Sequence, residues 1–295
     1  MPKLDLKENI KLSSYEEILG ANSDGEDIKM LPLDSLKPFS KHPFRVVDEE
    51  MTELVESIKE KGVLTPAIVR KCMDGGYEII SGHRRKRACE LAGINEMPVV
   101  IKELDDDEAT ILMVDANIQR ERILPSEKAH AYSMKYEAWK HQGKKGGSTL
   151  DEIGEAAGEV GKTVQRYIWL SNLSDKLLEF VDDKRLSIKA GDQISFLNDE
   201  AQEWIEELIE RNNTNISEED AKKIRKYSDE NQLTKALLIE ILSEEKPKER
   251  KIVLKNERLL KYFPADISNE EIEKTLIMLL EEWQRKSTSG PGVQK

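Results

Sequence analysis

The sequence changes its pattern near Pro125, and this change constrains the fold more than any other feature. Before it, short β-prone runs alternate with amphipathic helical stretches, which predicts a small α+β domain with mixed strands. After it, apolar residues recur with helical spacing in segments near 126–141, 150–158, 162–172, 174–182, 199–211, 217–227 and 234–242. Because 295 residues exceed one ordinary helical core, the two patterns predict separate domains.

Two polar stretches set the expected domain boundaries. Residues 1–28 mix charge with Gly and Ser and show no sustained period, and the run Ser243–Lys251 places Pro247 among alternating charges. The sequence therefore predicts a flexible amino-terminal arm (1–28), an α+β domain (29–123), an all-helical domain (124–245) and a small, mostly helical carboxy-terminal module with a tail (246–295).

The α+β domain shows clear start and stop signals for its elements. Two glycines after Asp74 predict a hairpin turn, and Gly62 and Gly93 each follow a helical pattern at the position that favours glycine. The expected order is a strand containing Leu31 and Leu33, a helix capped by Asp48 and running to about Lys61, strands at Ala67–Arg70 and Tyr77–Ile80, a helix over His83–Leu91, a strand over Pro98–Ile101 and a helix over Glu108–Ile118.

The carboxy-terminal module has a short strand prediction and one clear helix. Ile252–Leu254 is the predicted strand. Ser268 and Glu271 form a capping-box pattern that opens an amphipathic helix, and a disordered end is expected from Lys286. The apolar face of this helix makes the module the expected site of association between two copies.

Composition and charge exclude several classes of protein. The net charge of -12 argues against binding nucleic acid over the whole surface, although a local basic site remains compatible with it. Cys72 and Cys89 are the two cysteines, and their spacing predicts neither a disulfide framework nor a metal cluster. No apolar run is long enough to span a bilayer and the first residues are too polar for a signal peptide, so the expectation is a cytoplasmic protein without a membrane partner. His42, His130 and His141 lack partners at ligand spacing and are predicted to be surface or capping groups.

The segment GHRRKRA, Gly82–Ala88, follows a predicted strand and opens a predicted helix. A glycine lets the backbone approach a phosphate, free amides point outward from a helix start, and arginine side chains offer forked donors to phosphate oxygens. Arg84, Arg85 and Arg87 are the candidate phosphate ligands. The alternative is a solvated basic face on an ordinary helix.

Leu150–Leu173 has the pattern of a helix-turn-helix, with Thr149 as the expected cap and Gly158 in the turn. The predicted outward side chains of its second helix are typical of base and phosphate contacts, and a basic loop upstream could meet the DNA backbone. The candidate DNA-binding residues are Lys144, Lys145, Lys162, Thr163, Gln165 and Arg166. The alternative is a plain helical hairpin, which the acidic Glu159 at the turn favours because it would repel phosphate.

Three blocks in this order, followed by the helix-turn-helix pattern, resemble the ParB/RepB partition family. They are LTPAIVR at Leu64–Arg70, YEIISGHRRKRA at Tyr77–Ala88 and NIQRERILPSEKA at Asn117–Ala129, and the resemblance extends over about residues 30–200. It implies a ParB/sulfiredoxin-like amino-terminal fold with a CTP pocket. The first block would lie against base and sugar, the arginine turn would hold the triphosphate, and the third block would contact phosphates and Mg²⁺.

Carried over position by position, the resemblance implies a nucleotide-binding set and one Mg²⁺ ligand, Asn117. The nucleotide-binding set is Thr65, Pro66, Val69, Arg70, Gly82, His83, Arg84, Arg85, Arg87, Asn117, Gln119 and Arg120. Two positions depart from the family pattern, because His83 and Ala116 stand where the family commonly has Glu. Alanine cannot position water or metal, so nucleotide binding is expected rather than efficient hydrolysis, with at most a weak CTPase activity.

The resemblance also includes sulfiredoxin, whose reactive cysteine would stand at the position of Gly82 here. Cys89 lies further along, inside the predicted helix, where a single cysteine is ordinarily a small buried hydrophobic residue. Thiol chemistry needs an activated and accessible sulfur, so this enzyme activity is not expected.

The function implied is that of a dimeric, sequence-specific DNA-binding partition protein, a CTP-gated clamp acting in plasmid, mobile-element or chromosome segregation. Nucleotide would bridge the arginine turn and the segment Asn117–Arg120. The expected partners are double-stranded DNA, a second copy of the chain and a ParA-like ATPase, with a nucleoid- or plasmid-associated location. The alternatives are a ParB-like transcriptional regulator that binds DNA without nucleotide switching, and a nuclease or phosphotransfer enzyme.

Overall fold

The computed structural model describes residues 28–120, 122–143, 147–212, 214–243, 260–264 and 267–288. The chain divides into two compact units, Met1–Glu244 and Glu245–Lys295. The predicted amino-terminal arm apart from Ile28, the basic loop with Lys144 and Lys145, the linker after Ser243 and the strand at Ile252–Leu254 all lie outside the described residues. The division of the first unit into two domains stays a prediction.

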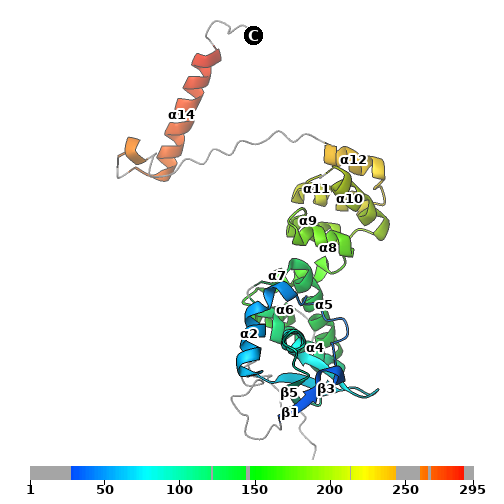
Figure 1. Ribbon diagram of the computed structural model, residues 1–295. Helices are drawn as coiled ribbons and strands as arrows, with labels where there is room; N and C mark the ends of the chain where they lie inside the picture. Colours follow the sequence, from blue (N-terminus) through cyan, green and yellow to red (C-terminus); the bar gives the residue numbers. More distant parts are fainter. Residues whose placement is uncertain are drawn as a thin grey trace, which may run out of the picture. The chain divides into compact units, whose positions relative to one another are not determined.

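A mixed five-stranded sheet forms the amino-terminal part of the first unit (Figure 1). Its order is β1-β5-β3-β4-β2, with β1 antiparallel to β5, β3 parallel to β5, β3 antiparallel to β4 and β2 parallel to β4. The strands are β1 Lys29–Pro32, β2 Leu36–Lys37, β3 Ala67–Lys71, β4 Tyr77–Ser81 and β5 Glu96–Ile101. The predicted hairpin is confirmed, with Gly75 and Gly76 at φ 88° and 78°.

Both faces of the central strands are buried. Because successive side chains of a strand point to opposite faces, neighbouring residues of one strand join different cores. Val69 and Ile79 join one core with Cys89 and Met97, whereas Ile68 and Ile80 join another. The helices that supply these cores are α2 Thr52–Lys61 and α3 His83–Ala92 on the first side and α4 Asp106–Ile118 on the second. The sheet therefore has a packed core on each face, and the β4–α3 turn follows directly where β4 ends at Ser81.

Two details of the amino-terminal prediction are wrong. Leu33 does not continue β1 but begins a 3₁₀ turn, Leu33–Ser35. Asp48 does not cap α2, since it lies in a 3₁₀ turn, Asp48–Glu50, and its carboxylate instead bonds Arg87 at 2.6 Å. At Asp48 the ion pair with the distant Arg87 is formed instead of the local cap that an aspartate before a helix favours.

The remainder of the first unit is helical, as predicted. Its helices are α5 Pro125–His141, α6 Gly147–Glu155, α7 Gly161–Leu170, α8 Asp175–Asp182, α9 Ile188–Ile194, α10 Asp199–Asn212, α11 Glu218–Asp229 and α12 Lys235–Ser243. The prediction missed α9, whose seven residues are too few to show a helical period. Thr149 is not a cap, because α6 begins at Gly147. Leu170, Leu177 and Ile194 belong to one core shared by these helices.

The second unit contains a 3₁₀ turn, Leu260–Tyr262, and the helix α14, Asn269–Thr288. The predicted capping box is confirmed, because the Ser268 amide donates to Glu271 Oε2 at 3.1 Å and Ser268 Oγ accepts from the Glu271 amide at 3.3 Å. The helix continues past Lys286, where a disordered end was expected. Among the described helices, none combines the length and apolar character needed to cross a bilayer.

Candidate functional site

The turn between β4 and α3 depends on Gly82. Its φ of +121° is a conformation that residues with a side chain rarely adopt. A Cβ at this position would lie 2.7 Å from Ala67 Cβ, which is far inside van der Waals contact. The glycine therefore lets β4 pass directly into α3 against the start of β3.

The three predicted arginines of this turn point to different partners. Arg85 Nη1 donates to the carbonyl oxygens of Thr65 and Pro66 at 2.7 and 2.6 Å, which ties α3 to the beginning of β3. Arg87 bonds the carboxylate of Asp48 at 2.6 Å and that of Glu90 at 3.0 Å. Arg84 lines a pocket, where its Nη2 donates to the Glu50 carbonyl oxygen at 3.2 Å.

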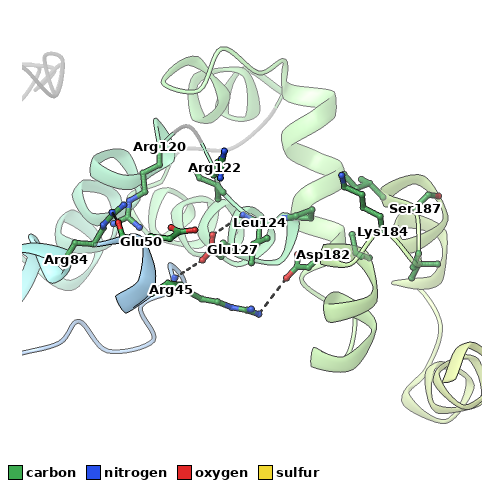
Figure 2. A pocket seen from close by; sticks show the side chains of 16 residues that line it. Arg45, Glu50, Arg84, Arg120, Arg122, Leu124, Glu127, Asp182, Lys184 and Ser187 are labelled. Carbon is green, nitrogen blue, oxygen red and sulfur yellow. Dashed lines mark hydrogen bonds and ion pairs between the residues drawn. The ribbon is translucent and has the colours of Figure 1, made fainter. Parts of the chain in front are cut away.

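The pocket encloses about 1050 Å³ and brings together segments that are distant in sequence (Figure 2). Five of its lining residues carry a positive charge and three a negative one. The positive residues are Arg45, Arg84, Arg120, Arg122 and Lys184, and the negative ones are Glu50, Glu127 and Asp182. Apolar side chains of the 123–125 segment and of the region from Val181 to Ile188 complete the wall.

Backbone and hydroxyl donors already hold two of the three carboxylates. Glu127 accepts from the amides of Arg45 and Leu124 at 2.7 and 3.0 Å. Asp182 accepts from the amide and Oγ of Ser126 at 2.9 and 2.6 Å. The pocket thus combines a net positive charge with an apolar wall, which suits an anion that carries an organic group.

Most of the other predicted nucleotide ligands lie outside the pocket. None of the four residues predicted from the first block, Thr65, Pro66, Val69 and Arg70, lines it. Val69 is fully buried in the sheet, and Arg70 pairs with Glu78 and Asp106, each at 2.6 Å. Gln119 ends α4 as its carboxy-terminal cap, whereas the next residue, Arg120, reaches the pocket.

The predicted magnesium ligand is turned into its own helix. Asn117 is 4% exposed, and its Nδ2 donates to the Met113 carbonyl oxygen at 2.7 Å. No group of three His, Cys, Asp or Glu side chains suited to a metal occurs in the part of the chain that the structure describes. A magnesium ion near Asn117 would therefore take most of its oxygen ligands from phosphate and water.

His83 of the arginine turn and His42 form a tilted ring pair, with ring centroids 3.8 Å apart and an interplanar angle of 39°. His83 Nε2 accepts from the Phe39 amide at 3.1 Å, and His42 Nδ1 lies 2.8 Å from the Phe44 carbonyl oxygen. Burial lowers the pKa of His83 to about 3 and that of His42 to about 4. Of the two roles predicted for His42, surface or capping group, the structure excludes the exposed surface position, because the ring is partly buried. His83 is a neutral acceptor rather than a ligand lining the pocket.

The α6–α7 pair has the predicted turn, with Gly158 at φ +66°. Gly154 touches that turn so closely that a Cβ would lie 2.1 Å from the Glu159 carbonyl oxygen. The Glu159 carboxylate, expected to repel phosphate, instead meets Lys128 Nζ at 2.5 Å and the Tyr132 hydroxyl at 3.0 Å. This acidic side chain is thus held by α5.

The predicted DNA-binding side chains of α7 border a groove of about 360 Å³ between α6, α7 and α9. Lys162, Gln165 and Arg166 line it, and Lys162 is exposed. Thr163 is half-buried on the same turn. Arg166 Nε contacts Asp192 Oδ2 at 3.3 Å, so one edge of the guanidinium is held by α9.

Sequence reasoning missed three cationic residues of the pocket. Arg122 stands inside the third block, and its position two residues after Arg120 was a usable signal. Arg45 and Lys184 had no comparable signal, because tertiary packing brings them there from before α2 and after α8.

Comparisons with known proteins show the family of the chain. The family model described as the ParB N-terminal domain matches residues 19–118. The chain is 34% identical over 189 residues to the chromosome-partitioning protein Spo0J of Thermus thermophilus. The alignment covers 63% of this chain and 67% of the relative. The chain belongs to the ParB family. The resemblance expected from the three blocks is thereby confirmed.

The chain is also 33% identical over 197 residues to the nucleoid occlusion protein of Geobacillus thermodenitrificans. That alignment covers 59% of this chain and 70% of the relative. Two solved structures of C-terminally truncated ParB from Caulobacter crescentus also match. The complex with the centromeric parS site has a TM-score of 0.41 at 22% identity, covering 67% of this chain and 98% of that one. The complex with CTP-gamma-S has a TM-score of 0.30 at 26% identity, covering 62% and 99%.

Proposed function

We propose that this ParB-family chain is a sequence-specific DNA-binding partition protein whose hold on DNA is gated by CTP. The observation that carries the proposal is the convergence of Arg84, from the arginine turn, and Arg120, from the third block, on one pocket. These two residues are 36 positions apart in the sequence, and they belong to two different blocks of the resemblance, both of which imply contacts with the nucleotide.

Guanidinium groups are suited to the triphosphate, because each offers forked donors to phosphate oxygens. Arg84, Arg120 and Arg122 are the proposed phosphate ligands, and Arg45 lines the same pocket. The apolar residues Ile123 and Leu124 would lie against the sugar or base. Mg²⁺ would supply further charge neutralisation on the phosphates, with the Asn117 side-chain oxygen as its proposed ligand from the predicted set.

The pocket also supplies a physical basis for gating. Its lining includes Arg84 next to the sheet and Leu186 and Ile188 from the region that contains α9. A ligand that contacts both parts stabilises the arrangement in which both contacts are made. We propose binding rather than efficient turnover, because Ala116 offers no carboxylate to position water.

On the DNA side, the exposed end of α7 is the proposed reader. Lys162 and Thr163 suit phosphate contacts, whereas Gln165 and Arg166 suit the edges of adenine and guanine. The proposed target is a specific partition site, and the proposed task is chromosome, plasmid or mobile-element segregation. A homodimer joined through α14 and a ParA-like ATPase complete the proposal, since Ile277, Leu280 and Trp283 of α14 are 50%, 62% and 67% exposed.

Calorimetric titration of CTP with Mg²⁺ tests the pocket, using Arg84→Ala and the matched control Arg87→Ala. Both variants remove an arginine from the same turn, but Arg87 is held by Asp48 and Glu90 away from the pocket. We expect Arg84→Ala to weaken CTP binding by about tenfold or more, from the ~1.5–3 kcal/mol of a hydrogen bond to a charged group. Arg87→Ala should bind CTP like the natural sequence.

Retention on closed and on linear DNA, with and without CTP, tests the gate. CTP-dependent retention on closed DNA alone would support the clamp. Sequence-specific DNA binding that ignores CTP would overturn the gate and support the alternative of a transcriptional regulator. Failure of both CTP binding and sequence preference would refute the whole proposal.

A further inference from the structure

Lys184 adopts a backbone conformation that favours glycine. It follows the end of α8 with a φ of +62°. The chain closes the helix there through the amides of Arg185 and Leu186, which donate to the Phe180 carbonyl oxygen at 2.8 and 2.9 Å. Glycine reaches this left-handed conformation without steric cost, whereas a residue with a Cβ is destabilised. The Lys184 amide donates to the Val181 carbonyl oxygen at 3.1 Å, which any residue except proline can do. Nothing in the helix ending therefore requires a lysine.

The side chain of Lys184 lies at the pocket, whereas its backbone closes α8. The side chain is exposed and lines the pocket, and Figure 2 shows it at the side away from Arg84 and Arg120. The nearby carboxylate of Asp182 is already held by Ser126 and lies 3.7 Å from Arg45 Nη2. Within the described ranges, no ion pair joins Lys184 to an acidic group. A cation thus stands at the pocket wall without a carboxylate to neutralise it.

We infer that Lys184 binds a phosphate of the pocket's nucleotide, and that this contact is the reason for a lysine at a position that favours glycine. This inference rests on the proposed function and adds a residue that neither the arginine turn nor the third block contains. Backbone strain retained beside a ligand pocket is a common property of functional sites, where the side chain offsets its conformational cost.

The position of Lys184 gives the contact a regulatory consequence. The turn that contains it leads into α9, and Ser187 and Ile188 line the same pocket. Further along α9, Asp192 contacts Arg166 of α7. A phosphate held by Lys184 therefore fixes the turn directly before the helix that positions a proposed base-reading arginine. Occupancy of the pocket and orientation of Arg166 are linked through one short helix.

Three variants test the inference in the full-length chain. Lys184→Gly removes both the charge and the strain, and Lys184→Gln removes the charge while it keeps a long side chain on the strained backbone. The matched control is Lys41→Gly, because Lys41 is also a lysine with a positive φ, +59°, and does not line the pocket. Thermal unfolding and calorimetric titration with CTP and Mg²⁺ are measured for each.

Both glycine variants should melt higher, by about 2 to 4 °C, because each relieves a left-handed conformation. Lys184→Gly and Lys184→Gln should both bind CTP about tenfold more weakly, whereas Lys41→Gly should bind it unchanged. A merely structural role predicts the rise in melting temperature without the loss of affinity. If the natural sequence binds CTP and both Lys184 variants bind it equally well, the inference is overturned while the proposed function stands. If the natural sequence binds no CTP, the proposed function has failed first.

Discussion

The buried pair of His42 and His83 predicts a loss of stability in mild acid. An ordinary histidine has a pKa of 6.5, whereas burial lowers the pKa of His42 to about 4 and that of His83 to about 3. Between about pH 6.5 and the folded-state values, the unfolded chain therefore binds protons that the folded chain does not. The free energy of unfolding must then fall as pH falls through this window. Above about pH 6.5 both histidines are neutral in the folded and the unfolded chain, so neither lowers the stability there.

The size of this loss follows from the window. At about pH 5 the medium lies roughly 1.5 pH units below the unfolded-state pKa and still above both folded-state values, and each pH unit corresponds to ~1.36 kcal/mol per group. Each histidine therefore contributes a loss of about 2 kcal/mol between about pH 7.5 and 5, and the pair about 4 kcal/mol. This is a large share of the stability of an ordinary domain.

Urea unfolding followed by circular dichroism at the two pH values measures the loss. The control is the double variant His42→Asn, His83→Gln, in which the Asn amide can donate where His42 Nδ1 faces Phe44 and the Gln oxygen can accept from the Phe39 amide. The stability difference between the two pH values should shrink by about 4 kcal/mol in the variant. An equal difference in both proteins would refute the assignment of the buried neutral pair.

Three further substitutions test other parts of the molecule. Gly82→Ala should destabilise the chain by about 2–3 kcal/mol in chemical unfolding, because residues with a side chain rarely adopt a φ of +121° and the new Cβ would clash with Ala67. Unchanged stability of this variant would contradict the prediction. Glu159→Gln should cost about 1–3 kcal/mol in the same assay by weakening the contact with Lys128, and an unchanged midpoint would show that the contact is not stabilising. Arg166→Ala should reduce discrimination at one base pair by about 1–3 kcal/mol, which selection from random duplexes detects; an identical selected sequence would exclude base reading by this residue.

Local patterns predicted most of the secondary structure. The strand at Tyr77–Ile80, the helix starting at His83 and its end at Gly93 were all confirmed, because glycine and apolar periodicity act over a few neighbouring residues. The prediction failed where distant groups decide. Asp48 has the sequence context of a helix cap, yet it bonds an arginine 39 positions away. The helix α9 was missed because its seven residues are too few to show a helical period, although it packs so closely that a Cβ at Gly191 would lie 2.8 Å from Leu170 Cδ2.

The sequence by itself determined that four cations follow a strand at Gly82 and that a glycine turn joins two helices near Gly158, since both are properties of adjacent residues. Only the tertiary structure decided which cations face the pocket. Arg85 and Arg87 are taken by carbonyl and carboxylate oxygens, whereas Arg84 lines the same pocket as Arg120 and Lys184. The physical reason is that the partner of a charged side chain depends on which groups the fold brings within a few ångströms, and separation along the chain does not specify this.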